Sequence, residues 1–199
     1  MSDSVQLIAG LGNPGDGYRD TRHNAGFWFV DAVARRYAGA LRADRRVHGD
    51  VGQVLVGAHR LHLIKPMTFM NRSGMAVAAL ARFYKIPAEQ ILVVHDELDL
   101  PAGVARLKFG GGHGGHNGLR SLISQLGTRD FRRLRLGIGH PGPGNDVVGY
   151  VLRRPAATDM QAIAQSIDAA LALLPMVLDG DIDKAMQRLH TPTDQLSGG

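Results

Sequence analysis

Residues 91–101, ILVVHDELDLP, are the stretch from which the fold is most directly predicted. Four consecutive apolar residues, followed by acidic residues and a proline, are typical of a central strand that runs into an acidic loop. Ligands of α/β sheets bind beyond the carboxyl ends of the strands. The polar residues at the end of this stretch are therefore the first candidates for a functional site.

On both sides of this stretch, predicted strands alternate with predicted helices. Strands are predicted at 5–9, 51–56, 60–65, 104–110 and 131–141, and the second and third of these form a hairpin. Helices are predicted at 24–37, 71–84, 116–127 and 157–178, and Pro175 predicts a kink or break in the last of them. The alternation predicts an α/β fold, a single-domain three-layer sandwich whose twisted mixed β-sheet is flanked by helices. We expect this domain to cover residues 1–189 and residues 190–199 to form a flexible C-terminal tail.

The composition is that of a globular protein without disulfides. Hydrophobic residues make up 44% and charged residues 21%, near the averages for soluble domains. No apolar run reaches the roughly 18 residues of a membrane-spanning helix, and the N-terminus lacks the basic region of a signal peptide. The absence of cysteine excludes a disulfide framework, a thiolate nucleophile and a cysteine zinc site. We expect a cytoplasmic protein with no membrane partner.

The chain is basic, with a formal net charge of +5. Nineteen of its 23 basic residues are arginines, whose planar guanidinium suits phosphates and stacks on bases. This favours a polyanionic partner, although a genome with arginine-rich codon usage would produce the same composition.

The glycine-rich segment GLGNPGDGYRDTRHN, residues 10–24, contains a G-x-G-x-x-G pattern that does not predict a dinucleotide site. A dinucleotide-binding loop runs directly into a helix N-terminus, whereas a polar, turn-rich segment intervenes here. What the segment provides instead is Asn13 on an exposed turn and His23 at a helix start.

His23 and Asp96 are candidates for a general base and its partner. A carboxylate just past a buried strand can accept a hydrogen bond from an imidazole N–H, select its tautomer and stabilise the imidazolium. That arrangement suits general-base catalysis. The alternatives are that His23 is a structural cap or surface ring and that the acids at 96, 97 and 99 are solvated loop residues.

Two more strand ends carry polar side chains. In KPMTFMNRSG, residues 65–74, Asn71 either caps a helix or offers its amide to the peptide group of a substrate. In GGGHGGHNGL, residues 110–119, the glycines permit positive φ and close approach of a ligand. The helix that starts near His116 or Asn117 offers unpaired N–H groups to an anion or a carbonyl oxygen. The glycines also allow residues 110–115 to move as a gate.

A metal site is a further alternative, because His113 and His116 could bind zinc or iron together with Asp96 or Asp99. The surrounding glycines hold no rigid ligand geometry, so we expect no metal and no other cofactor. The sequence has no G-x-S-x-G nucleophile elbow. Activated water is therefore the simplest nucleophile.

Six blocks of the sequence resemble those of the bacterial-type peptidyl-tRNA hydrolase family. The blocks are GLGNPG, TRHNAG, KPMTFMNRSG, HDELDLP, GGGHGGHNGL and RLRLGIGHPG, in the order of the family, and the resemblance covers residues 7 to about 152. It implies a monomeric enzyme that hydrolyses the ester between a peptide and the 3′-terminal ribose of tRNA. This reaction recycles tRNA from prematurely released peptidyl-tRNA.

The resemblance also implies roles for individual residues. His23 corresponds to the base that activates water, and Asp96 to the carboxylate that orients it. The substrate-binding or cleft-lining positions of the family match Asn13, Tyr18, Met70, Asn71, His116 and Asn117. The positions that contact the terminal phosphate of tRNA match Lys108 and Arg135. Gly17 departs from the pattern, since many members have an acid there.

Two other functions stay open from the sequence. One is a non-catalytic RNA-binding relative, against which an oriented base argues, because a pure binder does not need one. The other is a metal-dependent hydrolase or amidase, whose activity a chelator would remove.

Overall fold

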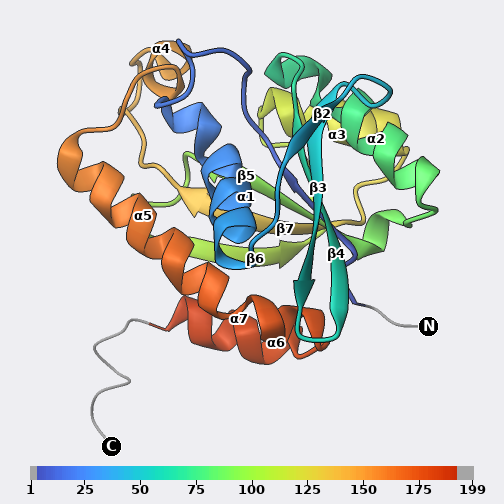
Figure 1. The fold of residues 1–199 in the computed structure, drawn as a ribbon. Helices are drawn as coiled ribbons and strands as arrows, with labels where there is room; N and C mark the ends of the chain where they lie inside the picture. The colour runs from blue at the N-terminus through green and yellow to red at the C-terminus, as the bar shows by residue number, and fades with distance from the viewer. Residues whose placement is uncertain (1–3, 192–199) are drawn as a thin grey trace, which may run out of the picture.

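A seven-stranded sheet forms the middle layer of the protein, whose computed structural model describes residues 4–191 (Figure 1). Its strands are β1 (Leu7–Gly10), β2 (Arg42–Asp44), β3 (Gly49–Val56), β4 (His59–Pro66), β5 (Ile91–Glu97), β6 (Ala105–Phe109) and β7 (Arg132–Gly137). The order is β2-β3-β4-β1-β5-β7-β6. The four central strands are parallel, while β2, β3 and β6 run antiparallel to their neighbours. The predicted mixed sheet is confirmed.

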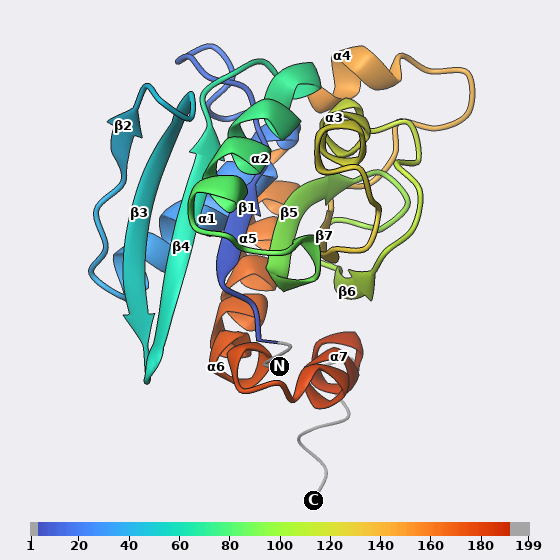
Figure 2. The same cartoon turned by 90° about the vertical axis from the view of Figure 1, so that its right-hand side faces the viewer.

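Helices cover both faces of the sheet, as Figure 2 shows. They are α1 (Ala25–Arg36), α2 (Ser73–Phe83), α3 (Asn117–Leu126), α4 (Val147–Val151), α5 (Ala157–Ala172), α6 (Leu174–Leu178) and α7 (Ile182–His190). One apolar core joins the sheet to α1, α5 and the C-terminal helices, and a second joins it to α2 and α3. The apolar stripe of α5, with Ile163 and Ile167, is buried in the first core. The three-layer sandwich is therefore confirmed.

Most predicted elements are present, with shifted ends. The chain enters α2 through a 3₁₀ turn, Met70–Arg72, and Arg72 occupies the N-cap position, so the alternative that Asn71 caps this helix is wrong. The break near Pro175 is confirmed, because α6 begins one residue before it. β2, α4 and α7 were not predicted. β2 and α4 have only three and five residues, too few to show a periodic pattern, whereas the nine residues of α7 do carry an amphipathic pattern that the sequence prediction did not use.

The C-terminal helix α7 extends through His190, the first residue of the predicted tail. The Nε2 atom of His190 accepts a hydrogen bond of 3.1 Å from the backbone N–H of Leu107. This contact ties α7 to the edge strand β6. Thr191 is described as well, and residues 192–199 of the predicted tail lie outside the described residues.

Two glycines let α1 lie directly on the sheet. A Cβ atom on Gly26 would lie 2.3 Å from the carbonyl oxygen of Val94, and one on Gly10 would lie 2.3 Å from the carbonyl oxygen of Gly26. Neither site has room for a side chain, so helix and strand backbones pack against each other. A 3₁₀ turn, Arg22–Asn24, leads directly into α1. The contact therefore places His23 beside the end of β5, where Asp96 lies.

We expect Gly26→Ala to destabilise the protein by about 1–3 kcal/mol or more, because overpacking pushes α1 away from β5. Activity should fall as well, since His23 moves with the helix. Urea unfolding and a hydrolysis assay measure the two effects. Gly17→Ala is the matched control, because a Cβ there meets nothing within 4 Å. Equal stability of the Gly26 and Gly17 variants would contradict the packing argument.

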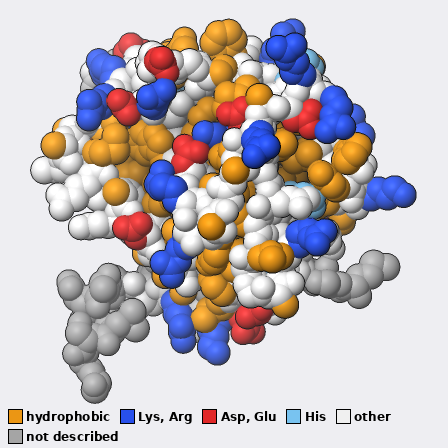
Figure 3. Space-filling model, viewed as in Figure 1, with side chains coloured by type: hydrophobic (Ala, Val, Ile, Leu, Met, Phe, Trp, Pro, Cys, Tyr) orange, Lys and Arg blue, Asp and Glu red, His pale blue; other side chains and the backbone are white. Residues whose placement is uncertain are grey.

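Within residues 4–191, none of the helices combines the length and the hydropathy that crossing a membrane requires. The face that carries α1 and α5 shows basic side chains spread among acidic and apolar ones (Figure 3). This face has no single basic patch, so the argument for a polyanionic partner depends on the functional site.

Candidate active site

A cleft of about 790 Å³ lies where β1, β4 and β5 end and α3 begins. Nine of the ten site residues predicted from the sequence line it: Asn13, His23, Met70, Asn71, Asp96, Lys108, His116, Asn117 and Arg135. Tyr18 is not among the lining residues. Its ring lies edge-on to Phe69, 6.3 Å between centroids, and Phe69 lines the cleft. The fold thus brings together side chains from six separate segments of the chain.

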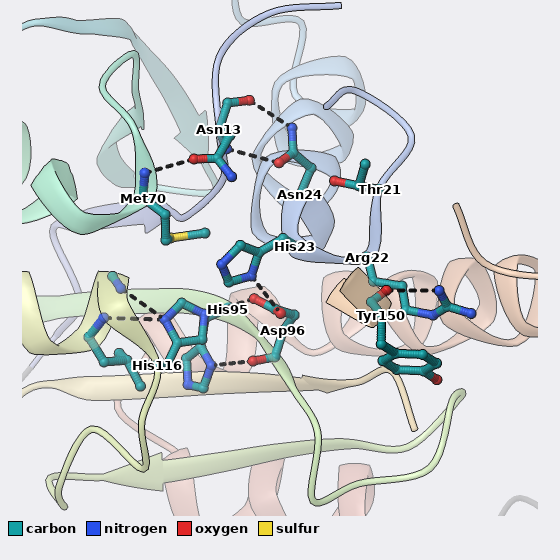
Figure 4. Close-up of polar contacts among 12 residues, drawn as sticks. Asn13, Thr21, Arg22, His23, Asn24, Met70, His95, Asp96, His116 and Tyr150 are labelled. Carbon is teal, nitrogen blue, oxygen red and sulfur yellow. Dashed lines mark hydrogen bonds and ion pairs between the residues drawn. The ribbon is translucent and has the colours of Figure 1, made fainter. Parts of the chain in front are cut away.

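His23 and Asp96 form the predicted pair. The Nδ1 atom of His23 lies 2.8 Å from Oδ2 of Asp96, as Figure 4 shows. Burial by itself raises the pKa of Asp96, but the two imidazoles beside it and their hydrogen bonds hold that pKa well below its usual range. An ionised carboxylate only accepts hydrogen bonds, so His23 donates from Nδ1. Its Nε2 then carries the lone pair and has no partner among the described residues.

The pKa of His23 lies above its ordinary value of 6.5. Burial of the ring lowers this pKa, whereas the negative charge of Asp96 and the hydrogen bond to it raise it by more. Asp96 therefore stabilises the protonated form of His23, which is the form that a general base acquires during the reaction.

His116 holds the other oxygen of the same carboxylate. It occupies the N-cap of α3, where its Nδ1 accepts from the backbone N–H groups of Gly118 (3.1 Å) and Leu119 (3.4 Å). An accepting Nδ1 has no proton, so the proton of the neutral ring must be on Nε2. That Nε2–H donates to Oδ1 of Asp96 over 2.8 Å. The helix cap thus selects the tautomer of His116, and the prediction that these N–H groups are free for a ligand is wrong.

The geometry also bears on the metal alternative. Ligand atoms of His23, Asp96 and His116 lie within 4.8 Å of one another. However, Nε2 of His116 must carry a proton to donate to Asp96, and a protonated nitrogen has no lone pair for a metal. His113 is half-buried, accepts from Gly115 N–H through Nδ1 and does not belong to that group. The set predicted from the sequence, with His113, therefore does not converge on one point.

Asn13 is buried, so the prediction that its turn exposes it is wrong, and two neighbours orient its side chain. Its side-chain oxygen accepts from the backbone N–H of Met70 over 2.7 Å, and its own backbone N–H and C=O both bond the amide of Asn24, at 2.9 and 3.0 Å. The backbone N–H of Met70 requires an acceptor, so the side-chain atom of Asn13 that faces it must be the oxygen. The other terminal atom of the Asn13 side chain is therefore the amide nitrogen. That nitrogen bonds no described residue, so it is available to donate to a ligand in the cleft. Figure 4 shows Asn13 and Met70 beside His23.

The other end of the cleft is basic. The Nε of Arg135 donates to Oε1 of Glu97 over 2.8 Å, so much of its charge is balanced locally. Lys108 is exposed and forms no ion pair with a described residue. Arg133, between them, is buried and donates to the carbonyls of Gly111 and Gly112. This contact anchors the glycine-rich loop, in which Gly110, Gly111, Gly114 and Gly115 adopt positive φ.

Three buried supports of the site were missed by sequence reasoning: Arg22, His95 and Arg133. Arg22 donates to the carbonyl of Tyr150 over 3.0 Å and lies 3.8 Å over the Tyr150 ring. His95 donates from Nδ1 to the carbonyl of Asp96 over 2.8 Å, and burial, aided by the neighbouring His116, lowers its pKa to about 3. In the sequence, Arg22 and His95 are adjacent to His23 and Asp96, and Arg133 is two residues from Arg135. These positions alone do not reveal the contacts that bury the three side chains.

A family model described as peptidyl-tRNA hydrolase matches residues 7–196 of the sequence. The chain belongs to this family. The peptidyl-tRNA hydrolase of Halorhodospira halophila (strain DSM 244 / SL1) is 57% identical over 185 residues, which are 93% of this chain and 95% of that protein. The peptidyl-tRNA hydrolase of Neisseria gonorrhoeae (strain FA 1090) is 49% identical over 191 residues, covering 96% and 100%.

Solved structures agree with the sequence comparisons. The crystal structure of peptidyl-tRNA hydrolase from Acinetobacter baumannii superposes with a TM-score of 0.92 at 46% identity and covers 96% of each chain. The resemblance to the peptidyl-tRNA hydrolase family is thereby confirmed, and with it the enzyme class, a carboxylic ester hydrolase. The family match extends well past residue 152, so α5, α6 and α7 belong to the family domain.

Proposed function

We propose that the chain hydrolyses the ester between a peptide and the 3′-terminal ribose of tRNA, with His23 as general base and water as nucleophile. The observation that carries this proposal is the single carboxylate held between two imidazoles. Asp96 accepts from His23 and His116 at 2.8 Å each, which leaves the lone pair of His23 Nε2 available in the cleft.

The reaction then needs no covalent intermediate. Nε2 of His23 takes a proton from water as the water oxygen attacks the ester carbonyl carbon. The bond from that carbon to the ribose 3′ oxygen breaks, and His23 returns the proton to this oxygen. The products are the free peptide acid and the 3′-hydroxyl of tRNA. Asp96 stabilises the imidazolium that exists between the two proton transfers.

The asparagines supply substrate contacts that do not depend on the peptide sequence. The free amide nitrogen of Asn13 is placed to donate to a carbonyl oxygen of the substrate. Asn71 and Asn117, both exposed on the cleft wall, offer a donor and an acceptor to peptide groups or to the attacking water. Met70, His116 and Tyr18 shape the surrounding wall. Such contacts suit a substrate whose peptide varies.

The basic end of the cleft is assigned to the tRNA. Lys108 and Arg135 lie on neighbouring strands, β6 and β7, and face the same cleft as the base. A phosphate near the acceptor end would meet Lys108 first, because Glu97 already balances Arg135. With this substrate, we assign the protein to the cytoplasm as a monomer that recycles tRNA.

The test is release of free tRNA from an N-acetylated aminoacyl-tRNA by the purified protein, with and without a chelator. We expect equal turnover in both samples, and none for the corresponding aminoacyl-tRNA with a free amine. Tight tRNA binding without turnover would favour the non-catalytic RNA-binding alternative. Turnover that disappears with the chelator would favour the metal-dependent hydrolase.

The pH dependence of kcat/KM should report the raised pKa of His23. Only the neutral ring accepts a proton, so activity rises with pH as His23 loses its proton. Because Asp96 raises the pKa of His23, the half-maximal point should lie above 6.5. Initial rates between pH 5 and 9 measure it, and a half-maximal point below 6.5 would contradict the assigned base.

A further inference from the structure

A second hollow, of about 250 Å³, lies at the opposite end of α2 from the catalytic cleft. Met70, just before α2, lines the cleft, whereas Phe83 and Tyr84, at the end of α2, line this hollow. The eleven residues of α2 separate the catalytic cleft from this hollow by about 16 Å along the helix. No described residue lines both the cleft and the hollow. Strands β3 and β4 lie beside α2 here (Figure 2). We call this site the aromatic hollow and define it by Arg46, Gln53, His62, Phe83 and Tyr84.

Three rings meet in the aromatic hollow. The centroids of His62 and Tyr84 are 4.0 Å apart with 33° between the planes, and Phe83 meets Tyr84 edge-on at 4.9 Å. Yet Phe83 is 63% exposed and Tyr84 is 42% exposed. These rings are therefore not part of a packed core and present apolar surface beside the hollow.

A guanidinium group lies next to these rings. The Nε and NH2 atoms of Arg46 donate to the carboxylate of Asp44 at 3.0 and 2.8 Å. The guanidinium carbon lies 5.7 Å from the centre of the Phe83 ring. Asp44 balances the charge of Arg46 and holds its plane in place, so the group acts mainly as a second flat surface.

The rim of the aromatic hollow is polar. Burial and the charge of Arg60 lower the pKa of His62, so this ring is neutral at pH 7. Its Nδ1 accepts from Nε2 of Gln53 over 3.2 Å, which leaves the proton of His62 on Nε2 as a donor. Arg60 does not line the hollow, but its charge acts on His62, so it is a positive charge beside the rim.

We propose that the aromatic hollow binds one unpaired base of an RNA strand, stacked against Phe83. A base uses every part of the site, with rings and a guanidinium plane for its faces and His62 and Gln53 for its polar edge. Arg60, beside the rim, supplies a positive charge for its phosphate. An apolar side chain of a protein partner would use the rings alone. The net charge of +5 also favours the polyanion. This inference does not depend on the proposed hydrolysis.

The test is an NMR titration of the ¹⁵N-labelled full chain with adenosine 5′-monophosphate and, separately, with N-acetylphenylalaninamide. We expect the nucleotide to shift the amide signals of Gly52 and Tyr84, which line the hollow. Phe83→Leu should weaken this binding about fivefold or more, because it removes a stacking ring while keeping an apolar side chain. Phe83→Tyr should retain it. The chain should stay folded when Phe83 is replaced, because this ring is largely exposed.

Two control variants separate this site from other surfaces. Leu55→Ala removes an apolar side chain that is 65% exposed and does not line the hollow, and His23→Ala alters only the catalytic cleft. Neither should change the nucleotide response at Gly52 and Tyr84. Shifts confined to the cleft, or equal affinities of Phe83→Leu and the wild type, would overturn the proposal. Shifts at the hollow with N-acetylphenylalaninamide alone would assign the site to a protein partner instead.

Discussion

Asp96→Asn is expected to lower kcat by about 10³–10⁴-fold while the protein stays folded. An asparagine side chain has one acceptor oxygen, whereas the carboxylate serves two imidazoles. His116 can only donate from Nε2, because the N-cap of α3 occupies its Nδ1. The asparagine oxygen must therefore face His116, and its NH₂ group must face His23. This forces the proton of His23 onto Nε2 and removes the lone pair that accepts the proton from water.

Single-turnover hydrolysis and circular dichroism measure the two parts of this prediction. Glu97→Gln is the matched control, because Glu97 is the next acid on the same strand and pairs with Arg135 instead of a histidine. The control should keep kcat near the wild-type value, with any change appearing in KM. An Asp96→Asn protein within tenfold of wild-type kcat would show that the tautomer of His23 does not limit the reaction.

His23→Ala is expected to lower kcat by about 10²–10⁴-fold or more, with little change in KM. The variant loses the general base but leaves the asparagines and basic residues of the cleft in place. His59→Ala is the matched control, since His59 also pairs with an aspartate, Asp179, at 2.8 Å, but far from the cleft lining. Retained turnover by folded His23→Ala would refute the assignment of the base.

The double variant His23→Ala/Asp96→Asn adds a second readout. If the two residues act as one unit, the double variant should be about as slow as the slower single variant. Losses that multiply would mean that Asp96 acts on the reaction by a route other than His23.

Long periodic elements and turn residues were predictable from the sequence. The apolar run that opens 91–101 marks β5, and Gly127, in the left-handed conformation at φ 72°, ends α3 where the pattern predicted. Both features depend on the side chains and backbone preferences of residues that are neighbours in the sequence. A local sequence pattern therefore predicts them. The carboxyl ends of parallel strands lie at one edge of a sheet, which brings most of the nine lining residues to one cleft. Lys108 and Arg135 reach it instead from the antiparallel strand β6 and from within β7. Short elements such as β2 and α4 carry too little pattern to be predicted in this way.

Tertiary structure alone decided how the protons are arranged in the site. Asp96 is 73 residues from His23 and 20 from His116, and no local pattern states which ring nitrogen faces which carboxylate oxygen. His116 illustrates the difference, because the sequence marks it as a residue near a helix start, but only its contacts at both nitrogens determine its tautomer. Arg22 and Arg133 are ordinary arginines in the sequence and become buried anchors only when distant carbonyls meet them. The sequence determined which chemical groups are present and which strand ends carry them. Packing determined their protonation and direction, because hydrogen bonds depend on distances and angles that exist only once the sheet and helices have assembled.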